Sequence, residues 1–448
     1  MLDPASASDT LAALIDQARR AGADAADAVY VGDRSTSVGT RLGALEDVSR
    51  AEGQEIGLRL FVGQQSAAVA SSDLSKDSLA ALVERAVAMA REAPEDRYAG
   101  LAPQDLLLSG GRADLDLDDG GDPDPAALRL AAHAAEDAAR SVAGITNSNG
   151  GSASATASTF ALATSHGFVG ATRATGYSCS ASVVAGSGSG MQRDYGWHSA
   201  RHLSDLEPPE AIGRRAGERA AARLNPVRVK AGPTAILFDP RVATTLLGHF
   251  VAAINGSAIT RQASFLLDAL GTRIFARGVT IHDDPSRRRG LRSRAFDGEG
   301  LPVAASDLVA DGVLTGWLAD SAAARQLGIA PTGHAVRGVS GAPGAGPSNL
   351  VMKPGPRSRE AMIADIRNGI LVTELIGQGV NNVTGDYSRG AAGFLIVDGE
   401  IGPAVSEITI ASNLRTMFAE LEPASDLRLR RGIDSPTLLV PQMMVASA

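Results

Sequence analysis

A helix pattern followed by a stretch of alternating strand residues occurs twice in the first half of this chain, and this order constrains the fold most. The first helix pattern can be capped by Ser8 or Asp9 and is ended by Gly22. Residues 27–71 then alternate between apolar and polar positions, which is typical of strands in an antiparallel sheet. A second helix pattern over about 73–91 closes this unit.

The same order returns after a linker rich in glycine, proline and acidic residues at about 105–125. A helix pattern over 124–142 is followed by period-two alternation over 145–200. Another helix pattern, over 209–224, ends before Pro226. The second unit therefore repeats the outline of the first.

The rest of the chain changes character. Short strand patterns separated by glycine-rich turns cover it, for example at 235–238, 312–318 and 393–401, and one apolar helix pattern lies at 242–254. We therefore predict an α+β fold with two N-terminal helix-plus-antiparallel-sheet modules and a β-rich C-terminal domain. The predicted domains are residues 1–105, 112–225 and 226–448.

Charge and composition exclude several classes of partner. The chain has 42 basic and 50 acidic residues, a net charge of -8, and no long basic block, so no nucleic acid partner is expected. No apolar run approaches the roughly 18–20 residues that span a bilayer, and the N-terminus lacks a signal-peptide pattern. The single cysteine, Cys179, excludes an intrachain disulfide. We expect a cytoplasmic protein without a membrane partner.

No metal site is expected in this chain. It contains neither HExxH nor HExxxH, in which two histidines of one helix converge on a zinc ion. Of its seven histidines, only His198 and His202 have a spacing close to that of ligands, and no third ligand accompanies them. A hydrogen-bonding role is the favoured interpretation of that pair.

One glycine-rich segment, residues 385–393, stands out as a candidate for ligand contact. Four polar side chains lie among its glycines: Asp386, Tyr387, Ser388 and Arg389. Arg389 could instead pair with Asp386 or Glu407 and only stabilise a turn. Both interpretations remain open, and a third hypothesis, a hydrolase site at these four residues, lacks an identifiable base.

Several longer motifs are spread along the chain: IGLRL at 56–60, GHFVAAING at 248–256, FDGEG at 296–300, DGVLTGWL at 311–318 and the run 377–411. In these motifs the chain resembles the TldD/PmbA family, and within it the TldE (PmbA) branch, over nearly its whole length. The family is also called a modulator of DNA gyrase, although nothing in this sequence indicates DNA binding.

The resemblance also has a consequence for zinc. The TldD branch carries HExxxH on a helix of its C-terminal domain and a later cysteine ligand, whereas this chain has Gly248, His249 and Ala253 at the His, Glu and His positions and no C-terminal cysteine. The resemblance therefore implies no catalytic residue and no bound cofactor in this chain, with zinc held by a TldD-type partner.

The implied function is that of a TldE/PmbA-like subunit in a hetero-oligomeric TldD/TldE zinc metallopeptidase that acts on unfolded or flexible peptides. The candidate residues for a peptide cleft are Asp386, Tyr387, Ser388, Arg389 and His249. The alternative is a stand-alone peptide-binding or scaffold protein without catalysis. A homodimer is a further possible state of the chain alone.

Overall fold

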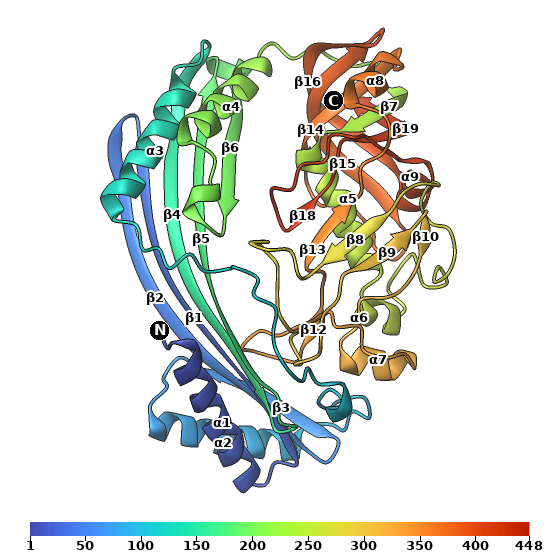
Figure 1. The fold of residues 1–448 in the computed structure, drawn as a ribbon. Helices are drawn as coiled ribbons and strands as arrows, with labels where there is room; N and C mark the ends of the chain where they lie inside the picture. The colour runs from blue at the N-terminus through green and yellow to red at the C-terminus, as the bar shows by residue number, and fades with distance from the viewer. Residues whose placement is uncertain (448) are drawn as a thin grey trace.

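The computed structural model describes residues 1–447 and confirms the predicted α+β fold (Figure 1). The N-terminal half contains α1 (Pro4–Arg20), β1 (Ala25–Arg41), β2 (Ala44–Val62), β3 (Gln65–Ser71), α2 (Lys76–Glu92), α3 (Pro125–Arg140), β4 (Ile145–Thr164), β5 (Val169–Ala185), β6 (Gln192–Ala200) and α4 (Pro209–Ala222).

The C-terminal half is rich in strands and has only short helices besides α5. It contains β7 (Gly232–Phe238), α5 (Pro240–Ala253), α6 (Gly256–Thr260), β8 (Ile281–Asp284), β9 (Ser306–Ala310), β10 (Val313–Leu314), α7 (Ser321–Leu327), β11 (Ala335–Val336), β12 (Gly344–Ala345), β13 (Asn349–Met352), α8 (Arg359–Ala364), β14 (Asn368–Ile376), β15 (Asp386–Val397), β16 (Glu400–Asn413), α9 (Leu414–Glu420), β17 (Glu422–Pro423), β18 (Ile433–Asp434) and β19 (Leu438–Ser447).

The first helix begins earlier than predicted. Its cap is Asp3, whose carboxylate accepts the backbone N–H groups of Ala5 and Ser6 at 2.9 Å each, so the prediction of Ser8 or Asp9 as the cap was wrong. Pro4 occupies the first helical position, where its missing N–H costs nothing. The hydroxyl of Ser8 instead donates to the carbonyl of Pro4 within the helix. The predicted end is confirmed, since Gly22 follows the helix with a φ of 102°.

The two N-terminal modules share one antiparallel sheet with the strand order β3-β2-β1-β4-β5-β6. The junction is the pairing of β1 with β4, in which Asp27 lies opposite Thr164. Both helix pairs cover the same face of this sheet, α1 and α2 at one end and α3 and α4 at the other (Figure 1). The opposite face is turned toward the C-terminal domain, where Val29 packs with Phe296.

The C-terminal domain is built around a strand barrel. Its sheet has the order β16-β15-β14-β7-β19-β17, and an additional pairing of β16 with β19 closes it. The residues on one face of these strands share a core with the apolar side of α5, including Leu246 and Phe250. A five-stranded sheet, β10-β9-β8-β13-β18, lies beside the barrel.

Buried ion pairs hold the two halves together. Asp27 of β1 pairs with Arg59 of β2 and with Arg337 of the C-terminal domain, whose Nη2 lies 3.1 Å from the Asp27 carboxylate. At the other end of the long sheet, Asp194 of β6 accepts from Arg241 of α5 at 3.2 Å. Among residues 1–447, no helix combines the length and the apolar character needed to cross a bilayer.

Candidate functional site

The glycine-rich candidate segment forms β15, in the wall of the barrel between β14 and β16. Side chains alternate along a strand. Tyr387 and Arg389 therefore point to the α5 side and are 1% and 8% exposed, whereas Asp386 and Ser388 are exposed on the other face. The four predicted residues thus divide between two faces and do not form one site.

The turn-stabilising interpretation of Arg389 is not observed either. Within residues 1–447, neither Asp386 nor Glu407 forms an ion pair with Arg389. Asp386 accepts hydrogen bonds from Thr384 and Asn413 instead, at 2.6 Å and 3.1 Å.

His249 joins the two inward-facing residues. The rings of His249 on α5 and Tyr387 on β15 lie edge to face, with centroids 6.0 Å apart. Each member of this group, which we name the His249 cluster (His249, Tyr387 and Arg389), has one buried polar atom without a hydrogen-bond partner among the described residues: His249 Nε2, Tyr387 Oη and Arg389 Nε. Buried polar groups are nearly always partnered, so a water molecule or an atom of a ligand is the expected partner of these groups.

The charge states in the His249 cluster follow from its burial. Burial and, next, the cation of Arg389 lower the pKa of His249, so its imidazole is neutral near neutral pH. Burial raises the pKa of the Tyr387 hydroxyl, and Arg389 opposes that rise. The cluster therefore offers a neutral imidazole, a protonated hydroxyl and a guanidinium, which together can donate hydrogen bonds to a carbonyl or carboxylate.

The residues of α5 do not fit a zinc ion. Gly248 has no side chain, Ala253 is a fully buried methyl group, and His249 would be a single imidazole ligand beside the cation of Arg389. Among residues 1–447, no three side chains of His, Cys, Asp or Glu are arranged to hold a metal ion. Ser388 lies on the face opposite His249, so no serine–histidine pair is formed either.

Replacing Tyr387 with Phe is expected to change the free energy of unfolding of the isolated chain by less than about 1 kcal/mol, because the lost hydroxyl is buried without a well-aligned partner among residues 1–447. Urea unfolding followed by circular dichroism measures this change. The matched control is Tyr177→Phe, which removes a hydroxyl that donates to Asp119 at 2.6 Å and should be destabilising by about 1–2 kcal/mol. Equal destabilisation by both changes would contradict the orphaned state of the Tyr387 hydroxyl.

The two histidines at near-ligand spacing turn to separate partners. His198 Nδ1 accepts the backbone N–H of Glu207 at 3.1 Å, while His202 Nε2 lies 3.0 Å from the carbonyl oxygen of Asp116. Their rings therefore serve as local hydrogen-bonding groups and do not converge.

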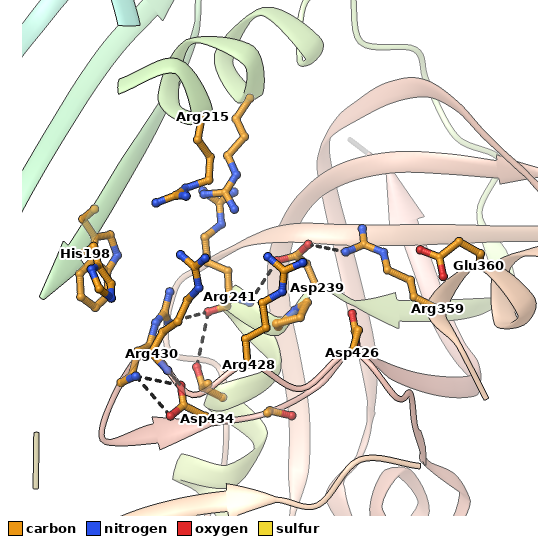
Figure 2. A pocket seen from close by; sticks show the side chains of 16 residues that line it. His198, Arg215, Asp239, Arg241, Arg359, Glu360, Asp426, Arg428, Arg430 and Asp434 are labelled. Atoms are coloured by element: carbon orange, nitrogen blue, oxygen red, sulfur yellow. Dashed lines mark hydrogen bonds and ion pairs between the residues drawn. The ribbon is translucent and has the colours of Figure 1, made fainter. Parts of the chain in front are cut away.

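Sequence reasoning missed a second feature, a cavity of about 350 Å³ where α4 and β6 face the C-terminal domain (Figure 2). Seven of its lining residues are arginines: Arg215, Arg219, Arg241, Arg359, Arg428, Arg430 and Arg431. We name this cavity the arginine pocket. The arginines come from α4, α5, the start of α8 and the segment before β18, so they form no basic block in the sequence. In the sequence, the three arginines within residues 428–431 were the one local pattern that indicated a positively charged site.

Three sequence models of one metallopeptidase family match this chain in consecutive order. They describe PmbA/TldA metallopeptidase domain 1, the central domain and the C-terminal domain, and they match residues 26–90, 118–224 and 231–447. Together they account for most of both halves.

Individual relatives agree with these matches. The metalloprotease PmbA of Escherichia coli O157:H7 is 36% identical over 94% of this chain and 92% of its own length. A metalloprotease PmbA homolog of Haemophilus influenzae is 35% identical over 84% of this chain and 82% of its own length.

Solved structures show the same fold. The crystal structure of a Bacteroides thetaiotaomicron protein, named as a proposed modulator of DNA gyrase, superposes with a TM-score of 0.91 at 28% identity and covers 98% of both chains. The structure of TldE from Thermococcus kodakarensis has a TM-score of 0.87 at 21% identity, covering 98% of this chain and 100% of that one.

Proposed function

This chain belongs to the PmbA/TldD family of metallopeptidases, and from that premise we propose that it is the TldE-type subunit of a hetero-oligomeric zinc metallopeptidase. In this proposal a TldD-type partner holds the zinc ion and cleaves the substrate, an unfolded or flexible peptide. The present chain encloses and orients that peptide.

The observation that carries the proposal is the composition of α5. Its residues at the positions of the family's zinc ligands are Gly248 and Ala253, and the remaining His249 is neutral and lies close to Arg389. A zinc peptidase needs three protein ligands and an activated water. Because α5 cannot supply these ligands, the hydrolytic step is assigned to the partner.

A free strand edge supports the presence of a partner. β3 pairs with β2 only from Ile56 to Val62, so within residues 1–447 the segment 44–55 of β2 has an unpaired edge, and residues 44–53 are exposed on both faces. Leu42, Leu45 and Val48 are 54%, 46% and 51% exposed at this end of the hairpin. Long exposed edges with apolar side chains favour pairing with another chain.

The proposal also places the chain in the cytoplasm and without a nucleic acid partner. Its lone thiol, Cys179, is fully buried, and burial raises the pKa of this thiol to about 11. A free thiol that forms no disulfide is typical of proteins in a reducing compartment.

The test measures zinc content and hydrolysis of casein or an unfolded peptide for three samples: this chain alone, a TldD-type subunit of the same organism alone, and their mixture. We expect near-stoichiometric zinc and chelator-sensitive hydrolysis in the mixture, and neither in this chain alone. The matched control is a mixture in which the first histidine of the partner's HExxxH motif is replaced by alanine, which should assemble without hydrolysis.

Other outcomes separate the alternatives. Chelator-sensitive hydrolysis by this chain alone would overturn the assignment of catalysis to the partner. An assembled mixture that binds peptides but does not hydrolyse them would favour the peptide-binding or scaffold function. Light scattering on the same samples distinguishes a hetero-oligomer from a homodimer.

A further inference from the structure

The arginine pocket has an excess of positive charge, because its lining contains more arginines than carboxylates. Figure 2 shows Arg215 projecting from α4 into the pocket, on the side where Arg430 and His198 lie. Four of the seven arginines have carboxylate partners: Arg215 and Arg430 both reach Glu207 at 2.6 Å, Arg241 pairs with Asp194, and Arg359 with Asp239 at 3.2 Å. The other three arginines of the lining are Arg219, Arg428 and Arg431.

Arg219, Arg428 and Arg431 have no carboxylate within 4.0 Å among the described residues. Arg219 reaches only the carbonyl oxygen of Tyr195, at 3.5 Å, and Arg431 lies over the ring of Trp197, 4.8 Å from its centroid. Burial lowers the pKa of Arg219 and of Arg431, so the nearby carboxylates offset only part of the cost of burying these two charges.

The carboxylates in the lining are already engaged or distant. Asp434 accepts the backbone N–H groups of Arg430 and Arg431, at 3.1 Å and 2.9 Å, and Asp426 accepts from Thr437. Glu360 lies beyond Arg359, on the side of the pocket away from His198 (Figure 2). Guanidinium groups that repel one another around an open cavity are stabilised by a bound anion.

The positive surface continues into a neighbouring cavity of about 260 Å³, which shares His198, Arg430 and Arg431 with the arginine pocket. It is lined further by Arg201 and by three consecutive arginines, 287–289. These three already have carboxylates within 4.0 Å, so Arg201 adds the uncompensated charge of this cavity. Two adjoining cavities of this kind can hold more than one anionic group of the same ligand. A single small anion would occupy one of them.

We propose that the arginine pocket binds the carboxylates of an acidic segment in an extended peptide, and so anchors that peptide between the two halves of this chain. The inference rests on the proposed function in one respect, namely that the ligand is a peptide. Nucleic acid is the less favoured polyanion. The aromatic ring of the lining, that of Trp197, is covered by Arg431, whereas single-stranded nucleic acids are bound by base stacking on free aromatic faces.

The test is binding of a fluorescein-labelled, glutamate-rich peptide to the full chain, measured by fluorescence anisotropy. The same peptide with glutamine in place of glutamate, and a single-stranded DNA oligonucleotide, serve as comparison ligands. Arg428→Gln and the double change Arg219→Gln with Arg428→Gln remove arginines without leaving a carboxylate unpaired, and Arg428 is exposed, so its change does not disturb the core. The matched control is Arg85→Gln on the exposed face of α2, at the other end of the sheet.

We expect the glutamate peptide to bind and the glutamine peptide to bind at least about tenfold more weakly. The double change should weaken glutamate binding by about tenfold or more, Arg428→Gln by less, and Arg85→Gln not at all. Raising the salt from about 0.1 M to 1 M, which shortens the screening length from about 10 Å to 3 Å, should also weaken binding.

Equal binding of the two peptides, or unchanged binding by the double variant, would overturn the proposal. Tighter binding of DNA than of the glutamate peptide, lost in the double variant, would overturn the assignment to a peptide. Because the measurement uses this chain alone, without partner or zinc, its failure is distinguishable from failure of the mixture to hydrolyse peptides.

Discussion

Replacing Asp27 with Ala is expected to lower the free energy of unfolding by about 3–5 kcal/mol, because two buried arginines lose their counter-charge. Asp27, Arg59 and Arg337 are 3%, 5% and 5% exposed. The two guanidiniums hold the pKa of Asp27 below its usual range in spite of its burial, so the carboxylate is ionised at neutral pH. Urea unfolding at neutral pH measures the effect.

The control is Asp33→Ala, which removes an exposed carboxylate from the same strand and should change stability by less than about 0.5 kcal/mol. Asp27→Asn keeps the size of the side chain and removes only its charge, so it should retain most of the loss. Similar unfolding of the Asp27 and Asp33 variants would show that the ion cluster does not hold the halves together.

A Glu299→Gln variant is expected to be more stable than the natural chain by about 3 kcal/mol at pH 8 and equally stable near pH 4.5. Burial, with a smaller contribution from Asp297, raises the pKa of Glu299 from 4.5 to about 7. The folded chain therefore retains this proton while the unfolded chain releases it, and the natural protein loses stability as the pH rises from about 4.5 to beyond 7. Glutamine has no proton to lose, and its amide oxygen can still accept from Ser321, which donates to Glu299 at 2.8 Å and 2.7 Å.

The measurement is the difference in unfolding free energy between variant and natural chain at several pH values. Taking this difference removes the opposite contribution of carboxylates such as Asp27, whose pKa is lowered. Glu92→Gln, at an exposed position of α2, should show no such pH dependence. A pH-independent difference for Glu299→Gln would contradict a raised pKa.

The order of helices and strands could be predicted because it depends on local periodicity. The pairing that joins the two modules into one sheet could not be predicted. Asp27 and Thr164 pair across the junction of β1 with β4, and no local pattern near either residue specifies its partner. The same holds for Arg337, which pairs with Asp27 from the other half of the chain. Tertiary packing decides these contacts.

The arrangement of the candidate residues depends on where β15 begins. The pattern of strands and turns at 393–401 contains the end of β15, the turn at Asp398 and Gly399 and the start of β16, but the beginning of β15 at Asp386 was not predicted. With the strand placed correctly, alternation alone separates Tyr387 and Arg389 from Ser388 and its neighbour Asp386. His249 was named as a cleft candidate from the resemblance, but its contact with Tyr387 was not predicted, because no periodicity links α5 to β15.

The pairing of β1 with β4 also has a consequence for folding during synthesis. The β1–β2 hairpin leaves the ribosome well before β4. One long edge of β1 is therefore unpaired while α2 and the linker are still being synthesised. Unpaired strand edges are the places where nascent chains pair with one another. A chain truncated in the linker would keep this edge of β1 unpaired. We expect such a chain to aggregate rather than to fold as a smaller domain.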